Sequence, residues 1–524
     1  MRWLFHIVVM LVWIGAGPAQ ARSDTPGGVF ATSNHFALYA DAPVEARAIL
    51  SDLEAFRAAV LADLDIIPPA GEAPLTLTIT DDMDAFRAVS PGGITAAVYL
   101  QSVAGDDIVV GYDRDPDGLL GDALEPDWLR LVLRHEVVHH LIETHYPRKL
   151  PLWLGEGLAE YYATFDPDAD GLAVFGRVLP EQERLPESGP WLPMRTVVES
   201  MARYPDYTAA SPGPSGNANE SLFRAQRLYY GQASALAHFV MDQPEGLARL
   251  HRFVDGLHEA GDSEDSFEAA FGLRYADLER RMRASIANGN QALRVRRVAP
   301  QPPRRFSVKP LSRDAGAANR LRLLLAHGHV RASVDALVSR ARLEAEPSAD
   351  TSPVLLAGSL HAWRRKDWDA SDRLARRVLV RDPNNAAALK LRAKTAYGRV
   401  SQDQTDDALW SAAEEAALRA LAADPDDAEM HLFRVAVSLP ESDRLRPEAL
   451  ASLDWLKTRQ AHLRLPHDAM MMIPALIYER RYSEADAVLD NAARWTDDPA
   501  DRFVIDRLRD SVATDRMAAG DDRN

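Results

Sequence analysis

The chain contains no cysteine among its 524 residues. Disulfide bonds, thiolate metal ligands, a thiol nucleophile and lipid attachment at cysteine are therefore all excluded. Two other signatures are also missing from the sequence: the P-loop that cradles nucleotide phosphates and the Gly-x-Ser-x-Gly turn of serine hydrolases. These absences exclude thiol chemistry, P-loop nucleotide hydrolysis and serine hydrolysis of the α/β-hydrolase type.

Long apolar runs are missing beyond the first residues, since none approaches the ~20 residues that span a bilayer. The chain begins MRWLFHIVVMLVWIGAGPAQARSD, with Arg2, an apolar run from Trp3 to Ile14 and then Ala-Gln-Ala ending at Ala21. These are the three regions of a secretory signal peptide, and residues 1–21 are predicted to be removed. We therefore expect a bacterial protein that is periplasmic or secreted, with no stable membrane insertion after signal cleavage.

Positive charge is also scarce, because 60 Lys and Arg stand against 77 Asp and Glu, for a formal net charge of −17. Bulk attraction to nucleic acid or to anionic membranes is therefore excluded, and we expect no nucleic-acid partner. The remaining composition, 47% hydrophobic and 26% charged, is ordinary for a globular protein. The length allows two to four domains.

The first half of the chain alternates between helix and strand patterns. Periodicity predicts a helix over 43–64 and three strands, over 74–82, 93–102 and 107–113. Two apolar helices follow, one beginning at Pro126 and one near Pro151. We therefore predict an α+β domain over 22–293, followed by a basic, proline-rich linker over 294–314.

Beyond the predicted linker the sequence is almost wholly helical and self-similar. Three segments begin with an aromatic residue, carry a small residue three positions later and reach an Asp-Pro pair. The aromatic, small and proline positions are Trp368, Ser371 and Pro383; Trp410, Ala413 and Pro425; and Tyr482, Ala485 and Pro499. The pattern resembles the tetratricopeptide repeat (TPR), a helix pair of ~34 residues. We expect TPR-like helical repeats over 315–512, with an irregular helical bundle as the alternative, and a disordered tail over 513–524. Stacked repeats form a concave face that would dock a substrate or a protein partner.

The segment 133–162 reads LRHEVVHHLIETHYPRKLPLWLGEGLAEYY and contains the motif HExxH. On a helix, positions i and i+4 share a face, so His135 and His139 can bind one metal ion. Glu136 lies beside His135 and can take a proton from a metal-bound water without being a ligand. The flanking positions are strongly apolar, so this helix is expected to be buried. Burying two histidines and a glutamate without a partner is costly, which favours a metal site.

Two residues compete for the place of the third ligand. His145 has the spacing of the metzincin pattern HExxHxxGxxH, but Ile142 stands where that pattern needs glycine for a sharp turn. On a continuous helix His145 is rotated by ~240° from His139, away from the metal, and it is expected to face solvent near the helix end. A metzincin-type site with His145 remains the alternative.

Glu156 is the favoured third ligand. It lies on the second helix, between Gly155 and Gly157, which we expect to permit close approach to the first helix. Glu160 follows one turn later on the same face and can accept a hydrogen bond from a ligand imidazole. The two helices would then face one metal ion.

The combination of HExxH with the later W-L-x-E-G-x-A-E-Y resembles the gluzincin class of zinc metallopeptidases, which includes thermolysin and the zinc aminopeptidases. Within this class it resembles the peptidase MA-like families of exported bacterial domains, over about residues 29–290. The resemblance implies a thermolysin-like α+β zincin domain, one Zn²⁺ per chain held by His135, His139 and Glu156, and a peptide or protein substrate. It also implies a sheet edge that pairs with an extended peptide, supplied by the strand at 93–100 or at 107–113.

The resemblance implies in addition a downstream tyrosine that stabilises the oxyanion as water attacks the carbonyl. In LYYGQASALAHFV, Tyr230 is the candidate and Tyr229 the fallback, while a core role for the tyrosine is the alternative; His238 is expected to be a packing or surface residue. The G-x-M-E-N motif by which aminopeptidases hold a free amine is absent, which favours an endopeptidase. We therefore expect an exported zinc metallopeptidase with Glu136 as general base. The alternative is a non-catalytic periplasmic scaffold that acts through the TPR-like repeats.

Overall fold

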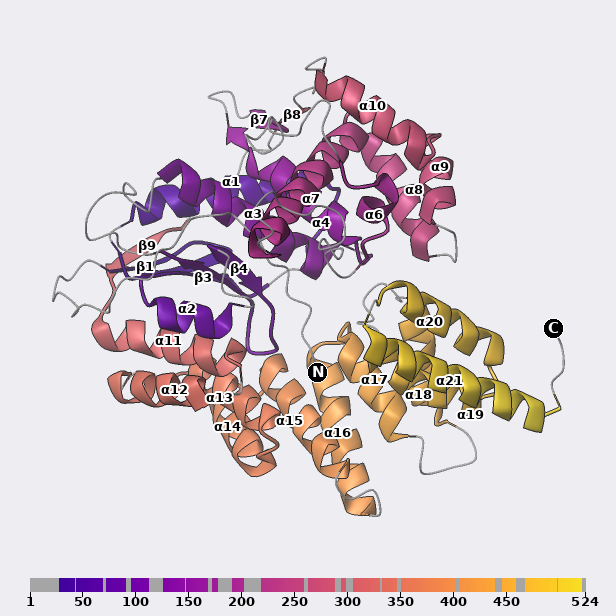
Figure 1. Cartoon of the computed structure of the whole chain (residues 1–524). Coiled ribbons are helices and arrows are strands. Elements are labelled where there is room, and N and C mark those ends of the chain that lie inside the picture. Colours follow the sequence, from indigo (N-terminus) through magenta and orange to yellow (C-terminus); the bar gives the residue numbers. More distant parts are fainter. Residues whose placement is uncertain are drawn as a thin grey trace.

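The computed structural model describes the chain in eighteen segments, and statements about its structure refer to these. They are residues 28–42, 44–68, 72–90, 96–112, 126–146, 148–167, 172–177, 191–201, 218–258, 263–287, 294–297, 305–329, 332–345, 350–401, 406–438, 445–458, 467–496 and 498–520. The predicted signal peptide lies outside them, as does most of the loop before residue 218. An α+β part comes first along the chain and a helical part follows it (Figure 1).

A six-stranded mixed sheet with the strand order β4-β5-β3-β2-β1-β9 forms the centre of the α+β part. Its strands are β1 (Val29–Thr32), β2 (Phe36–Ala40), β3 (Leu75–Thr80), β4 (Ala97–Leu100), β5 (Asp107–Gly111) and β9 (Ser307–Pro310). The pairs β2–β3 and β3–β5 are parallel, whereas β4–β5, β1–β2 and β1–β9 are antiparallel. Of the two strands proposed for the free edge, β4 lies at the edge of the described sheet and β5 lies inside it.

Different helices cover the two faces of this sheet (Figure 1). Along β4, Ala97 and Tyr99 join the apolar core of α1 (Ala46–Asp63) and α3 (Pro126–His145). The alternate residues, Val98 and Leu100, join the core of α2 (Met83–Val89) and α11 (Arg313–His327). Since successive side chains of a strand point to opposite faces, both faces of β4 are buried. The second face is covered by the first helix of the helical part.

Helix α4 (Leu152–Ala163) lies between α3 and α7 (Ala218–Met241). A Cβ atom at Gly157 would lie 2.5 Å from the Ala233 carbonyl oxygen, whereas one at Gly155 would meet nothing within 4 Å. Close helix approach therefore depends on Gly157 alone, and the helix it admits is α7. The expectation that both glycines admit α3 was wrong.

The remaining elements of the α+β part cover α4 and α7. They are the helices α6 (Met194–Val198), α8 (Gly246–His258), α9 (Ser263–Phe271) and α10 (Tyr275–Ala287), and a three-stranded sheet of β6 (Asp166–Pro167), β7 (Leu172–Phe175) and β8 (Arg294–Arg297).

The segment 294–314, predicted as a linker, contributes β8, β9 and the first residues of α11. Strand β9 pairs with β1 and is the edge strand at the end of the larger sheet opposite β4. Its residues are mostly exposed, and basic or proline residues are common on exposed edge strands because they discourage further pairing. The basic, proline-rich composition from which a linker was predicted is therefore equally typical of an exposed edge strand.

The helical part consists of consecutive helices that pack on their neighbours. They are α11, α12 (Ala332–Glu344), α13 (Ser352–Arg364), α14 (Trp368–Arg381), α15 (Ala386–Val400), α16 (Asp407–Ala423), α17 (Ala428–Val437), α18 (Pro447–Thr458), α19 (His467–Tyr478), α20 (Tyr482–Arg494) and α21 (Pro499–Ala518). The small residues of the sequence pattern, Ser371, Ala413 and Ala485, are all buried. None of the described helices is long and apolar enough to cross a membrane.

The third Asp-Pro pair differs from the other two. Helices α14 and α16 end immediately before Asp382 and Asp424, as the pattern predicts. Helix α20, in contrast, already ends at Arg494, and Asp498-Pro499 begins the next helix, with the Asp498 carboxylate capping it. That helix runs to Ala518, so the predicted disordered tail is helical from 513 to 518.

The helical part also contacts the α+β part near its C-terminal end. Trp495, just after α20, stacks on His258 of α8 with 4.9 Å between the ring centroids. The Lys149 ammonium lies 5.5 Å from the Trp495 ring, and the Arg494 guanidinium donates a 2.7 Å hydrogen bond to the Leu257 carbonyl. Among the described residues, the helical part thus contacts the α+β part both around α11 and in this second region (Figure 1).

Candidate metal centre

Helices α3 and α4 bring His135, His139 and Glu156 together. The Nε2 atoms of the two histidines are 3.0 Å apart, and each lies 3.5 Å from Glu156 Oε2. Ligand atoms at ~2.0–2.1 Å from a tetrahedral zinc ion are about 3.4 Å apart. The three side chains are at most 1% exposed. This triangle therefore fits a single Zn²⁺-sized ion.

The two glutamates of the centre have opposite electrostatic character. Burial raises the pKa of Glu156, but the His139 and His135 rings outweigh burial and hold it well below its usual range. Burial and the Glu156 carboxylate raise the pKa of Glu136 well above its usual range. Neither oxygen of Glu136 makes a well-aligned hydrogen bond to a described residue. Glu156 is thus held in its charged form, in which it could bind a metal ion, whereas burial disfavours the charged form of Glu136.

The side of β4 that points away from β5 faces Glu136. The Gly111 N–H donates to the Ala96 carbonyl at 3.0 Å, and in an antiparallel ladder such pairs alternate. The Tyr99 amide therefore points away from β5, and it lies close enough to Glu136 to lower the pKa of that carboxyl slightly. The edge strand and the HExxH helix thus meet at Glu136.

Glu160 and Arg134 lie beside the HExxH motif, and Arg134 connects its helix to two neighbouring segments. Glu160 Oε1 lies 3.5 Å from His135 Nδ1, but this nitrogen has no well-aligned hydrogen bond to a described residue, so Glu160 acts here as a nearby negative charge. The Arg134 guanidinium donates to the Asp52 carboxylate of α1 at 2.9 Å and to the Phe165 carbonyl after α4 at 2.6 Å. Sequence analysis did not single out Arg134, although an arginine in so apolar a helix signals a buried partner.

The tyrosine pair on α7 is buried, and its two members differ. The Tyr229 hydroxyl forms a 2.6 Å hydrogen bond with the Ser200 hydroxyl. Burial, and to a lesser extent the Glu156 carboxylate, raise the pKa of Tyr229 well above its usual range. Tyr230 is 7% exposed and contacts the Tyr229 ring edge-on. The Glu156 carboxylate thus acts on the hydroxyl of the fallback residue Tyr229.

Neither His238 nor His145 belongs to the triangle of His135, His139 and Glu156. His238 is buried and packs edge-on against Tyr161, in agreement with a packing role. His145 does not join the triangle; its side chain is 3% exposed and its Nε2 lies 2.9 Å from Glu72 Oε1. The expectation that His145 faces solvent was wrong, because the segment before β3 covers the end of α3.

Comparison of the chain with protein-family models, curated proteins and solved structures gave no match. The functional interpretation therefore rests on the site itself.

Proposed function

We propose that this chain is an exported zinc metallopeptidase whose centre is His135, His139 and Glu156. The observation that carries the proposal is the buried triangle of one carboxylate and two imidazole ligand atoms, with separations of 3.0 to 3.5 Å. The adjacent Glu136, which has no well-aligned partner among the described residues, supplies the second component of a hydrolase. The proposed architecture is a thermolysin-like zincin domain followed by TPR-like repeats.

A zinc ion at this centre would supply a Lewis acid that activates water and polarises the scissile carbonyl. Glu136 would accept the proton of the attacking water and later deliver it to the leaving amine nitrogen. Its burial beside Glu156 raises its pKa, which helps it hold that proton between the two transfers. Tyr230, with Tyr229 as the alternative, would donate a hydrogen bond to the developing oxyanion.

The outer edge of β4, on the side away from β5, would orient the substrate. An extended peptide added to this edge would run beside Glu136, since the Tyr99 amide on that edge lies near the Glu136 carboxylate. This mode of binding reads the peptide backbone and suits an endopeptidase. The helical part would dock the larger substrate or a protein partner on its concave face.

The competing proposal is a non-catalytic scaffold that acts through the helical part. It is favoured by the burial of the triangle, whose side chains are at most 1% exposed. The two functions differ in their need for Glu136, because a scaffold would need the ligands at most for stability and would have no use for a proton acceptor.

The test is cleavage of a mixed peptide library by the zinc-loaded full chain, with products read by mass spectrometry. We expect Glu136→Gln to retain zinc while its rate falls by about 10²–10⁴-fold. Glu143→Gln, the same substitution on the same helix, is the matched control and should cleave at the wild-type rate. A wild-type chain that binds no zinc, or a Glu136→Gln variant as active as wild type, would contradict the peptidase proposal.

A further inference from the structure

A second group of metal-type ligands lies beside the first and plays no part in the proposed reaction. It consists of Glu72, on the segment before β3, and of His140 and His145 on α3. The side chains are 16%, 8% and 3% exposed, respectively. On a helix, His140 is rotated by ~100° from His139, so the two groups use different sides of α3.

The ligand atoms of this second group converge on one point. His145 Nε2 lies 2.9 Å and His140 Nε2 lies 3.6 Å from Glu72 Oε1. These separations bracket the ~3.4 Å expected around a tetrahedral zinc ion. Although they are close, Glu72 Oε1 and His145 Nε2 make no well-aligned hydrogen bond to any described residue. Short separation without hydrogen-bond geometry is what ligand atoms show when they point to a shared centre.

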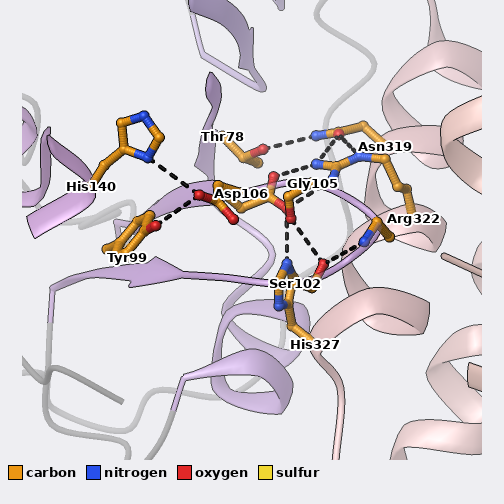
Figure 2. A network of polar contacts seen from close by, with 11 residues as sticks. Thr78, Tyr99, Ser102, Gly105, Asp106, His140, Asn319, Arg322 and His327 are labelled. Atoms are coloured by element: carbon orange, nitrogen blue, oxygen red, sulfur yellow. Dashed lines mark hydrogen bonds and ion pairs between the residues drawn. The ribbon is translucent and has the colours of Figure 1, made fainter. Parts of the chain in front are cut away.

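Other contacts orient two of the three ligands, Glu72 and His140, toward that centre. The Arg57 guanidinium donates a 2.6 Å hydrogen bond to Glu72 Oε2, which leaves Oε1 directed at the histidines. The Asp106 carboxylate lies 3.3 Å from His140 Nδ1 and also accepts a 2.8 Å hydrogen bond from the Tyr99 hydroxyl, as Figure 2 shows. A carboxylate on Nδ1 keeps the proton there and leaves the Nε2 lone pair for a metal.

We propose that Glu72, His140 and His145 bind a second divalent transition-metal ion, for which Zn²⁺ is the best fit. Two imidazoles and one carboxylate form an accepted zinc ligand set, with water completing the coordination. The ion joins the last two turns of α3 to the segment that leads into β3. It thereby fixes the C-terminal end of the HExxH helix and is structural, so the inference goes beyond the proposed peptidase activity.

A cavity lies beside this second group. His145 also lines a cavity of about 540 Å³, whose other walls include Ile66, His251 and Val254. His251 belongs to neither ligand group, and its ring packs on Tyr146. It therefore provides a matched control: a histidine of the same cavity that should not bind the ion.

The experiment counts zinc ions per full-length chain. The chain is stripped with a chelator, incubated with excess Zn²⁺, desalted and analysed by inductively coupled plasma mass spectrometry. We expect two ions in wild type and in His251→Gln, and one ion in each of His139→Gln, His145→Gln and Glu72→Gln. Glu72→Gln removes a ligand without touching α3, so it remains informative should His145→Gln misfold. Zn²⁺ should also raise the unfolding temperature of His139→Gln but not that of the double variant His139→Gln/His145→Gln.

The outcomes separate the two sites. One ion in wild type, lost in His139→Gln and kept in His145→Gln, would overturn the second site: the cluster would then be a proton-mediated ion pair. If wild type binds one ion, and this ion is kept in His139→Gln but lost in His145→Gln, the result would support the second site. The proposed peptidase would then have no metal centre. A wild-type chain without zinc would overturn both.

Discussion

Asp107, at the start of β5, and Arg322, in α11, form a two-pronged salt bridge whose side chains are 0% and 7% exposed. One of its hydrogen bonds, from Arg322 Nη1 to Asp107 Oδ2, measures 2.8 Å. His327 Nε2 lies 2.9 Å from the same carboxylate. The neighbouring Asp106 faces His140, so one hairpin connects the helical part with the HExxH helix.

Replacement of Arg322 by methionine should be strongly destabilising. The variant keeps the side-chain volume but leaves Asp107 buried without its cation, which typically costs 3–5 kcal/mol. Denaturant unfolding followed by circular dichroism would measure the loss. Arg365→Met is the control, because Arg365 and its partner Asp335 are each 45% exposed, and such pairs contribute less than about 1 kcal/mol. Equal losses in the two variants would contradict a role for burial.

His238 should make stability sensitive to mild acid. Burial lowers the pKa of His238 to about 4, so the folded chain disfavours its protonation. The unfolded chain takes up this proton near pH 6.5, and stability is therefore full above pH ~6.5 and falls as the pH drops toward 4, by up to about 1.4 kcal/mol per pH unit. His238→Phe should flatten that part of the stability profile, as measured by denaturant unfolding between pH 7 and pH 4. A variant with an unchanged slope would show that His238 is not its source.

The two glycines beside Glu156 should respond oppositely to alanine. A Cβ at Gly157 would lie 2.5 Å from the Ala233 carbonyl oxygen, so Gly157→Ala should push α4 and α7 apart at a cost of about 1–3 kcal/mol. Gly155 has open space, and Gly155→Ala should be neutral or stabilising by up to about 1 kcal/mol through helix propensity. Thermal unfolding and zinc content of both variants would test this. Loss of stability in Gly155→Ala would contradict the assigned packing.

Removal of zinc from the proposed centre of His135, His139 and Glu156 should lower the free energy of unfolding. In a His145→Gln background, which isolates that centre, zinc at 1,000 times its dissociation constant should add about 4 kcal/mol. Glu136→Gln should keep this stabilisation and Glu156→Gln should lose it, because of the two only Glu156 is proposed as a ligand. Thermal scans with Zn²⁺ and with a chelator would provide the comparison, and equal behaviour of the two variants would contradict the assigned ligand set.

The parts of the fold and site that could be predicted depend on local spacing. Helix geometry alone places His135 and His139 on one face, and the short connection between α3 and α4 brings Glu156 to them. The coarse architecture, an α+β part followed by a helical part, also follows from periodicity and agrees with the structure.

The parts that could not be predicted depend on contacts between distant residues. His145 meets Glu72, which lies 73 positions earlier, on a segment that carries no motif. The pairing of β9 with β1 joins strands almost 280 residues apart, and no local pattern marks such a partner. Arg134 was missed for the same reason, because Asp52 lies 82 positions away.

The docking of α11 on the sheet has a consequence for the order in which the protein matures. The chain is made from its N-terminus, so α3 and α4 exist well before α11, which covers Val98 and Leu100 and neutralises Asp107. Until α11 arrives, α2 covers this face of β4 only in part, and Asp107 on the hairpin that faces the HExxH helix lacks its Arg322 partner. The packing around the HExxH helix is thus completed only after α11, which begins at Arg313, has been made.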